Sequence, residues 1–185
     1  MNLIDVATGA KLISRGAVIA YPTEACFGIG CDPFNEIAVR RVVRIKNRPR
    51  GMGLILIADH VNKLLPFIEL PQESMMDPAV ASWPGPYTWI FPASSRMPIS
   101  LRTPTHTIAV RVTAHPGSAH LSRLAGCAIV STSANRHGQI PIRVHREVAR
   151  CLGESLDFVV RGPLGRQKNP TQITDAVSGK VLRPG

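Results

Sequence analysis

The sequence has few acidic and few aromatic residues, and both shortages limit the functions open to it. Among 185 residues, 12 are Asp or Glu and 22 are Lys or Arg, which leaves a net charge of +10. No pair of carboxylates stands out, which disfavours acid/base hydrolysis of the glycosidase kind. Phe, Trp and Tyr make up 5% of the chain, which disfavours RNA recognition by base stacking and leaves recognition by shape or backbone.

Cysteine and histidine are too scattered to predict a disulfide framework or a metal site. No two cysteines have CxxC spacing, and no HExxH motif or His–Cys cluster occurs. We therefore expect free, buried thiols in a reducing compartment. The four cysteines are Cys26, Cys31, Cys127 and Cys151.

Long hydrophobic runs are also missing. The first 16 residues include Asp5, Lys11 and Arg15 and form no continuous apolar segment, which argues against a signal peptide. The apolar run at 54–58 is far too short to span a bilayer. We expect a cytoplasmic, monomeric protein without membrane association, and the length suits one domain over residues 1–185.

The common nucleotide-binding motifs are absent. The sequence has neither a GxxxxGK[ST] loop nor a GxGxxG motif after a strand. If the protein binds ATP, a different arrangement of residues must hold the phosphates.

What the chain does have is arginine, whose planar fork of donors matches phosphate oxygens in pairs. The excess of positive charge predicts a surface for polyphosphate or RNA, although a solvated basic helix face would look the same. The densest stretch contains Arg40, Arg41, Arg44, Lys46, Arg48 and Arg50.

Helical and strand patterns interleave irregularly, which predicts an α/β domain with a twisted, mixed sheet flanked by helices. We expect helices at 5–15, 35–47, 60–68, 79–83, 117–124 and 144–152. We expect strands at 17–21, 27–31, 54–58, 87–91, 108–112, 128–130 and 158–160, with two more near the C-terminus. The segment 93–107 reads as a loop.

Polar residues stand where several of these elements end, and ligands gather beyond strand ends in α/β sheets. Each group also has a structural explanation. The Tyr21-Pro-Thr-Glu24 segment could form a tight turn, Lys46 and Arg48 could stabilise a helix C-terminus, and Ser131-Thr-Ser-Ala-Asn135 could cap a helix. Arg111 is harder to dismiss, because a cation in an apolar strand needs a partner.

Taken together, these segments resemble the YrdC/Sua5 family of threonylcarbamoyl-AMP synthases, in its short bacterial form. The resemblance covers essentially the whole chain and implies the YrdC-like fold. The matching segments are Tyr21-Pro-Thr-Glu24, Phe27-Gly-Ile-Gly-Cys-Asp32, Lys46-Asn-Arg-Pro49, Gly53-Leu-Ile-Leu-Ile57, Ser82-Trp-Pro-Gly-Pro86, Ala109-Val-Arg-Val112, Ser131-Thr-Ser-Ala-Asn135 and Leu182-Arg-Pro-Gly185.

The resemblance implies a reaction. L-threonine takes up bicarbonate or CO2 as a carbamate, whose oxygen attacks the α-phosphate of ATP, so that pyrophosphate leaves and threonylcarbamoyl-AMP forms. The product would pass to a downstream threonylcarbamoyl-transfer complex that modifies an adenosine of tRNA. ATP would be a substrate, with Mg²⁺ carried by the triphosphate.

The resemblance also implies roles for particular residues. Lys46 and Arg48 would be catalytic and would bind ATP, together with Ser133, Asn135 and Arg183. The threonine contacts would be Thr23, Arg111 and Ser131, with Arg111 facing the amino-acid carboxylate.

The chain departs from the family pattern at a few positions. Ala25 stands where longer members often have threonine, and Ile57 where they often have histidine, which leaves the pose of threonine open. Arg136 and His137 replace the usual small residues ahead of Gly138.

Two other functions stay open at this point. An RNA-binding factor without chemistry, recognising double-stranded RNA or tRNA, would explain the positive charge. A carbamoyltransferase acting on another acceptor would use carbamoyl phosphate in place of bicarbonate.

Overall fold

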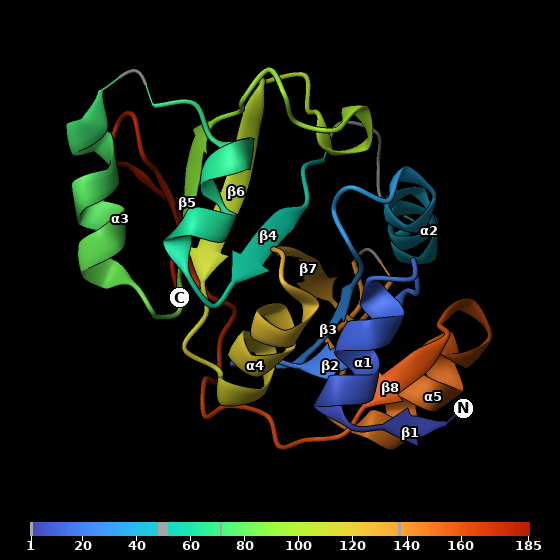
Figure 1. Cartoon of the computed structure of the whole chain (residues 1–185). Coiled ribbons are helices and arrows are strands. Elements are labelled where there is room, and N and C mark those ends of the chain that lie inside the picture. The colour runs from blue at the N-terminus through green and yellow to red at the C-terminus, as the bar shows by residue number, and fades with distance from the viewer. Residues whose placement is uncertain (1, 48–51, 71, 137) are drawn as a thin grey trace.

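Ten strands form one sheet in the part of the chain that the computed structural model describes, residues 2–47, 52–70, 72–136 and 138–185 (Figure 1). Their order across the sheet is β1 (Leu3–Ile4), β8 (Phe158–Val160), β2 (Ile19–Pro22), β3 (Phe27–Gly30), β7 (Ile129–Ser133), β4 (Ile55–Ala58), β6 (Thr107–Val112), β5 (Tyr87–Pro92), β9 (Gln172–Asp175) and β10 (Val181–Arg183).

The sheet is mixed, as the irregular alternation of elements predicts. The pairs β1–β8, β8–β2, β4–β6 and β5–β9 are parallel. The other neighbouring pairs are antiparallel, including the β2–β3 hairpin and the strands β3, β7 and β4 in the centre. The predicted α/β class is confirmed.

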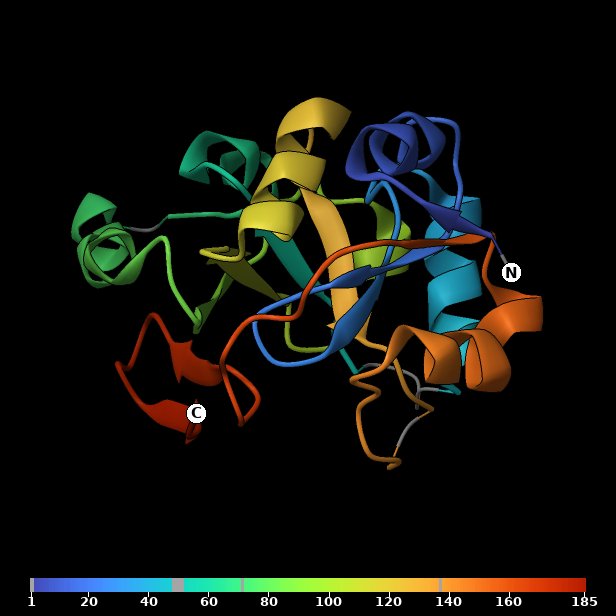
Figure 2. The ribbon, with the colours of Figure 1, turned by 90° about the horizontal axis from the view of Figure 1, so that it is seen from below.

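Helices pack on both faces, and side-chain hydrogen bonds start three of them. The Asp5 carboxylate accepts from Thr8 N at 2.8 Å before α1 (Val6–Ile13), and the Asn35 amide oxygen accepts from Ala38 N at 3.0 Å before α2 (Glu36–Lys46). The His115 side chain caps α4 (Pro116–Ala125). Two further α-helices, α3 (Asp77–Ser82) and α5 (His145–Leu152), are shorter than α4. Figure 2 shows α1 and α4 side by side, with the C-terminal hairpin away from them.

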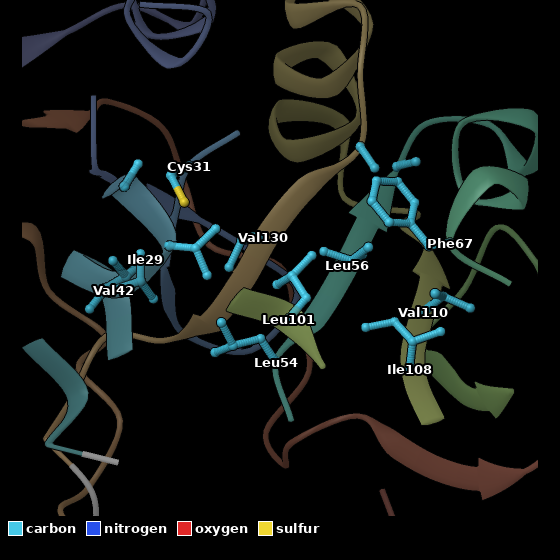
Figure 3. Close-up of a cluster of buried hydrophobic side chains, with 14 of the residues drawn as sticks. Ile29, Cys31, Val42, Leu54, Leu56, Phe67, Leu101, Ile108, Val110 and Val130 are labelled. Carbon is cyan, nitrogen blue, oxygen red and sulfur yellow. The ribbon is translucent and has the colours of Figure 1, made fainter. Parts of the chain in front are cut away.

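Alternating side chains give the sheet a core on each face. Val130 and Leu56 belong to the larger cluster (Figure 3), which also includes residues of α2 and α5. Their neighbours Ile129 and Ile57 belong to the smaller cluster with α1 and α4. Burial of these apolar side chains is the main force that holds the sheet between its helices.

The face of the sheet that bears the smaller cluster continues beyond the helices that pack on it, as the register of the central strands shows. Ile129 pairs with Ile57, which pairs with Arg111; two residues along β7, Ser131 pairs with Ile55. Because residues two apart on a strand share a face, Ser131 and Arg111 point to the side that α1 and α4 cover only in part. This face therefore passes from an apolar core to a polar surface.

Three expectations need correction. The predicted helix 60–68 is a pair of 3₁₀ turns, Val61–Lys63 and Leu65–Phe67, because Pro66 lacks the N–H that a continuous α-helix needs. Strand β7 runs on to Ser133, so Ser131 lies within a strand rather than after it and caps no helix. All four cysteines are free as predicted, but only Cys31 is buried.

No helix in the described residues combines the length and the apolarity needed to cross a membrane.

Asp157 ties α2 to the start of β2. Its carboxylate accepts from Arg41 at 2.9 and 3.0 Å and from Val18 N at 2.7 Å. Burial raises the pKa of this carboxyl, but the hydrogen bonds from Arg41 and Val18 outweigh burial and hold its pKa below the usual value. A depressed folded-state pKa contributes stability above the unfolded pKa, and this stability is lost as pH falls through the folded pKa.

We therefore expect Asp157→Asn to lower the free energy of unfolding by about 1 kcal/mol at pH 7, because the charge-assisted bonds are weakened. The difference from the parent should be smaller at about pH 2 than at pH 7, because protonation of Asp157 removes the charge as pH falls through its lowered folded-state pKa. Urea unfolding at both pH values measures it. Glu36→Gln, which breaks the exposed pair with Arg40, is the control and should change stability by less than about 0.5 kcal/mol. An equal Asp157 effect at both pH values would contradict the argument.

Candidate functional site

A cavity of about 660 Å³ opens over the polar part of the sheet face. Its floor comes from β3, β7, β4, β6 and β5, and its rim from the loops between strands and from the C-terminal hairpin. Every predicted site residue that the structure describes lines it: Thr23, Lys46, Arg111, Ser131, Ser133, Asn135 and Arg183. The remaining predicted residue, Arg48, lies outside the described residues, so its position stays a prediction.

Lys46, the last residue of α2, is buried and joined to the end of β7. Its ammonium donates to the Ser133 and Asn135 carbonyls and to the Asn135 side-chain oxygen, each at 2.6 Å. Ser133 Oγ is 3.4 Å away and donates to the Asn135 side-chain oxygen at 2.6 Å. Asn135 Nδ2 in turn donates to the Gln139 carbonyl. An ammonium, a hydroxyl and an amide thus meet at one end of the cavity.

Arg111 lies at the other end, on β6, and is 5% exposed. One of its terminal nitrogens, Nη1, donates to Thr88 Oγ1 at 3.1 Å and Thr171 Oγ1 at 2.9 Å, and Nη2 donates to the Glu24 carboxylate at 3.2 Å. The expectation that this buried cation has partners is confirmed. Arg111 Nε is buried without a hydrogen-bond partner, which is costly unless a ligand supplies an acceptor.

The turn between β2 and β3, residues 23–26, forms one wall of the cavity. Thr23 Oγ1 donates to the Cys26 carbonyl at 2.7 Å, so the threonine hydroxyl holds the turn and keeps lone pairs for accepting bonds. Gly28 follows on the cavity floor, where an added Cβ would lie 3.0 Å from Thr23 Cγ2 and 3.5 Å from Ser131 Oγ. The missing side chain leaves Thr23 and Ser131 accessible to one small ligand.

A C-terminal strap, residues 162–171, closes this wall from outside. Gly165 N donates to the Thr23 carbonyl at 2.9 Å and Gln167 N to the Glu24 carbonyl at 3.1 Å. Farther along, the Thr171 carbonyl accepts from Arg183 Nη2 at 2.6 Å, which holds the β10 arginine at the cavity. Burial and then the nearby charge of Arg111 lower the pKa of Arg183, so two guanidinium groups share this region.

The cavity-lining residues that sequence reasoning missed include Arg143, Lys168 and Thr171. Arg143 Nη1 donates to the Ala25 and Gln167 carbonyls and so joins the turn to the strap. The only sequence signal for Arg143 is a cation in a loop that contains Pro and Gly. Its contacts could not be predicted, because they join segments that are far apart in the chain.

The cavity is built for anions. The described residues that line it include five cations and no carboxylate, and a low-dielectric recess strengthens attraction between these cations and a negative ligand. The five are Lys46, Arg111, Arg143, Lys168 and Arg183. Among the residues that the structure describes, no group of three His, Cys, Asp or Glu side chains could hold a metal ion.

The fold and the cavity define an α/β protein with a cationic cavity over the polar part of its sheet. A family model for the Sua5, YciO and YrdC proteins, described as telomere recombination, matches residues 11–185. The chain therefore belongs to the Sua5/YciO/YrdC family.

Two relatives in sequence carry the same name. A threonylcarbamoyl-AMP synthase of Methylobacillus flagellatus is 46% identical over 93% of this chain and 95% of its own length. One of Thiobacillus denitrificans is 45% identical over 92% of this chain and 90% of its own.

Solved structures share the fold. P. abyssi Sua5 complexed with L-threonine has a TM-score of 0.89 and 28% identity, covering 97% of this chain and 54% of its own. E. coli YciO has a TM-score of 0.86 and 25% identity, covering 97% of this chain and 88% of its own. This chain thus spans about half the length of the Sua5 structure.

We expect the Lys46 end of the cavity to bind inorganic pyrophosphate, and Lys46→Met to weaken this binding by about tenfold or more, because one charge-assisted hydrogen bond is lost. Titration calorimetry measures the affinity. Lys63→Met is the matched control, since that ammonium also bonds a carbonyl and a side-chain oxygen but lies outside the cavity. Equal binding by parent and Lys46→Met would refute the assignment.

Proposed function

We propose that this chain is an L-threonylcarbamoyladenylate synthase, a nucleotidyltransferase that transfers the AMP part of ATP to a carbamate of L-threonine. The observation that carries the proposal is the convergence of two separate cationic ends, around Lys46 and around Arg111, on one cavity without lining carboxylates among the described residues. Family membership and the shared name of the relatives support it.

The reaction needs such a site because both reactants are negative. The threonine amine adds to CO2, or displaces hydroxide from bicarbonate, and loses a proton to form the carbamate. A carbamate oxygen then bonds to the α-phosphorus, the bond to the β-phosphate oxygen breaks, and pyrophosphate leaves. Fixed cations offset the repulsion between the reactants and the charge that builds on the leaving group.

The nucleotide phosphates would occupy the Lys46 end. The Lys46 ammonium, the Ser133 hydroxyl and the Asn135 amide can all donate to phosphate oxygens once a ligand competes with their internal bonds. Arg48 would add a second cation there, and Arg183 would approach the nucleotide from β10. In this assignment Lys46 and Arg48 stabilise the pentavalent phosphorus and the departing pyrophosphate.

Threonine would occupy the Arg111 end, where the buried Nε needs an acceptor that the carboxylate would provide. Thr23 and Ser131 border the same space and would contact the amine or the hydroxyl of the substrate. Ile57 is fully buried and does not line the cavity, whereas Ala25 does. Position 57 therefore supplies no contact, and recognition of the substrate falls to the other side chains.

Mg²⁺ would arrive on the triphosphate, because Mg²⁺ retains waters and takes phosphate oxygens readily. The lack of a metal-binding cluster among the described residues fits a metal held by the nucleotide. A tRNA and a downstream transfer complex would be the partners of the product, and we expect a cytoplasmic monomer.

The proposal predicts pyrophosphate release from ATP that depends on both threonine and bicarbonate in the presence of Mg²⁺. A coupled pyrophosphate assay with each substrate left out in turn measures it. Carbamoyl phosphate in place of bicarbonate should support no turnover; turnover would indicate a carbamoyltransferase. Salt-sensitive RNA binding that is unaffected by Lys46→Ala, without pyrophosphate release, would indicate an RNA-binding factor.

Arg111→Lys should lower kcat/KM for threonine about 100-fold, because lysine cannot reproduce the planar donors. The KM for ATP should change by no more than about twofold, since the phosphates lie at the other end. Steady-state kinetics with each substrate varied separately decide the point. Equal rises in both KM values would contradict the division of the cavity into two ends.

A further inference from the structure

Glu24, behind the cavity wall, has no role in the function proposed above, yet it forms a buried ion pair with Arg111. Its side chain is 7% exposed and that of Arg111 is 6% exposed, with Nη2 and Oε2 at 3.2 Å. We propose that Glu24 is a positioning residue that fixes the Arg111 guanidinium for the substrate carboxylate; this inference rests on the function proposed above.

The carboxylate of Glu24 is itself held in place. Its second oxygen, Oε1, accepts from Thr113 Oγ1 at 2.6 Å, and Thr113 Oγ1 accepts from His115 N at 3.2 Å. The His115 ring accepts from Ser118 N through Nδ1, so its Nε2 donates to the Pro163 carbonyl of the strap at 3.0 Å. The chain of bonds therefore runs from Arg111 through the start of α4 to the strap.

The strap returns to Arg111 through Thr171, whose hydroxyl accepts from Nη1. Glu24 and Thr171 thus hold the guanidinium from different sides, and Thr88 holds it from β5. These bonds leave Nε and one N–H of Nη2 for a ligand. A guanidinium whose orientation is set before binding loses less entropy when it binds a carboxylate.

Glu24 does not have the position of a base. It is not among the residues that line the cavity, and each of its oxygens accepts a hydrogen bond from a neighbouring residue. Its carboxylate also offsets the buried positive charge of Arg111. The geometry therefore points to action through Arg111 and not on the substrate.

The first test is Glu24→Gln, which keeps the size of the side chain and removes its charge. We expect the KM for threonine to rise about tenfold while the KM for ATP stays within about twofold. Thr113→Val leaves the carboxylate charged but removes its hydroxyl partner, so the KM for threonine should rise by a smaller factor, about threefold. Glu24→Asp keeps the charge but has a shorter side chain. Its KM for threonine should lie between those of the parent and Glu24→Gln.

The second test is a double-mutant cycle with Arg111→Lys. If Glu24 acts through Arg111, adding Glu24→Gln to Arg111→Lys should change the KM for threonine by less than about twofold. If instead the effects of the two substitutions on the KM for threonine multiply independently, Glu24 acts by another route, and the inference is overturned.

Two control variants separate positioning from general damage. Asp59 resembles Glu24 in accepting from a cation and a hydroxyl, Lys63 and Ser122, and it also pairs with Arg123 at 3.5 Å, but none of these partners lines the cavity. Thr174 is buried like Thr113, but its hydroxyl accepts from Gln172, which does not line the cavity. Asp59→Asn and Thr174→Val should leave the ratio of the two KM values unchanged, even if the unfolding temperature falls.

The outcomes are distinct. A parent protein without threonine-dependent pyrophosphate release would overturn the proposed function and the present inference with it. An active parent whose Glu24 variants keep the KM for threonine, or raise both KM values equally, would overturn only the role of Glu24. A selective rise that disappears in the Arg111→Lys background would support it.

Discussion

The central constraint on this structure is the gathering of positive side chains in one cavity without a lining carboxylate among the described residues. Like charges repel, so each needs a partner that does not occupy the ligand space. Carbonyl oxygens at the end of β7 accept from Lys46, and the Thr171 carbonyl accepts from Arg183. Arg111, which is 5% exposed, has a carboxylate partner, Glu24, which does not line the cavity. The site stays attractive to anions because these partners leave the cavity surface positive.

The mixed sheet makes this arrangement possible. Antiparallel pairing of β3, β7 and β4 beside parallel pairing of β4 and β6 sets Gly28, Ser131, Ala109 and Arg111 on one face within a few residues. The same face carries the apolar cluster under α1 and α4. A core and a binding surface therefore share the same strands, and the rigidity of the packed part extends to the polar part.

The C-terminal segment completes the site. Its strap bonds to the Thr23 and Glu24 carbonyls, and its hairpin adds β9 beside β5 and brings Arg183 to the cavity. The segment from residue 162 to the C-terminus thus contributes to the Arg111 end of the cavity. Gly165 is suited to this approach, because an added Cβ would lie 2.5 Å from the Glu24 carbonyl oxygen.

Sequence reasoning recovered most of the elements, because helix and strand periods are local properties. Its errors have local causes as well. Pro66 converts the expected helix into 3₁₀ turns. The second half of β7 was not predicted as a strand, because Ser131 and Ser133 are polar. The segments at 21–24, 46–49 and 131–135 drew attention as polar groups at the ends of apolar elements. Their grouping into one site came only from the resemblance to a known family.

The sequence by itself determined the α/β class, the excess of positive charge, and seven of the residues that line the cavity. The tertiary structure alone decided which of them meet and what lies behind them. Glu24 and Arg111 are 87 positions apart, and Arg143 reaches across to Ala25 and Gln167. Such contacts depend on strand order and register, which arise from the packing of the whole chain and leave no local pattern in it.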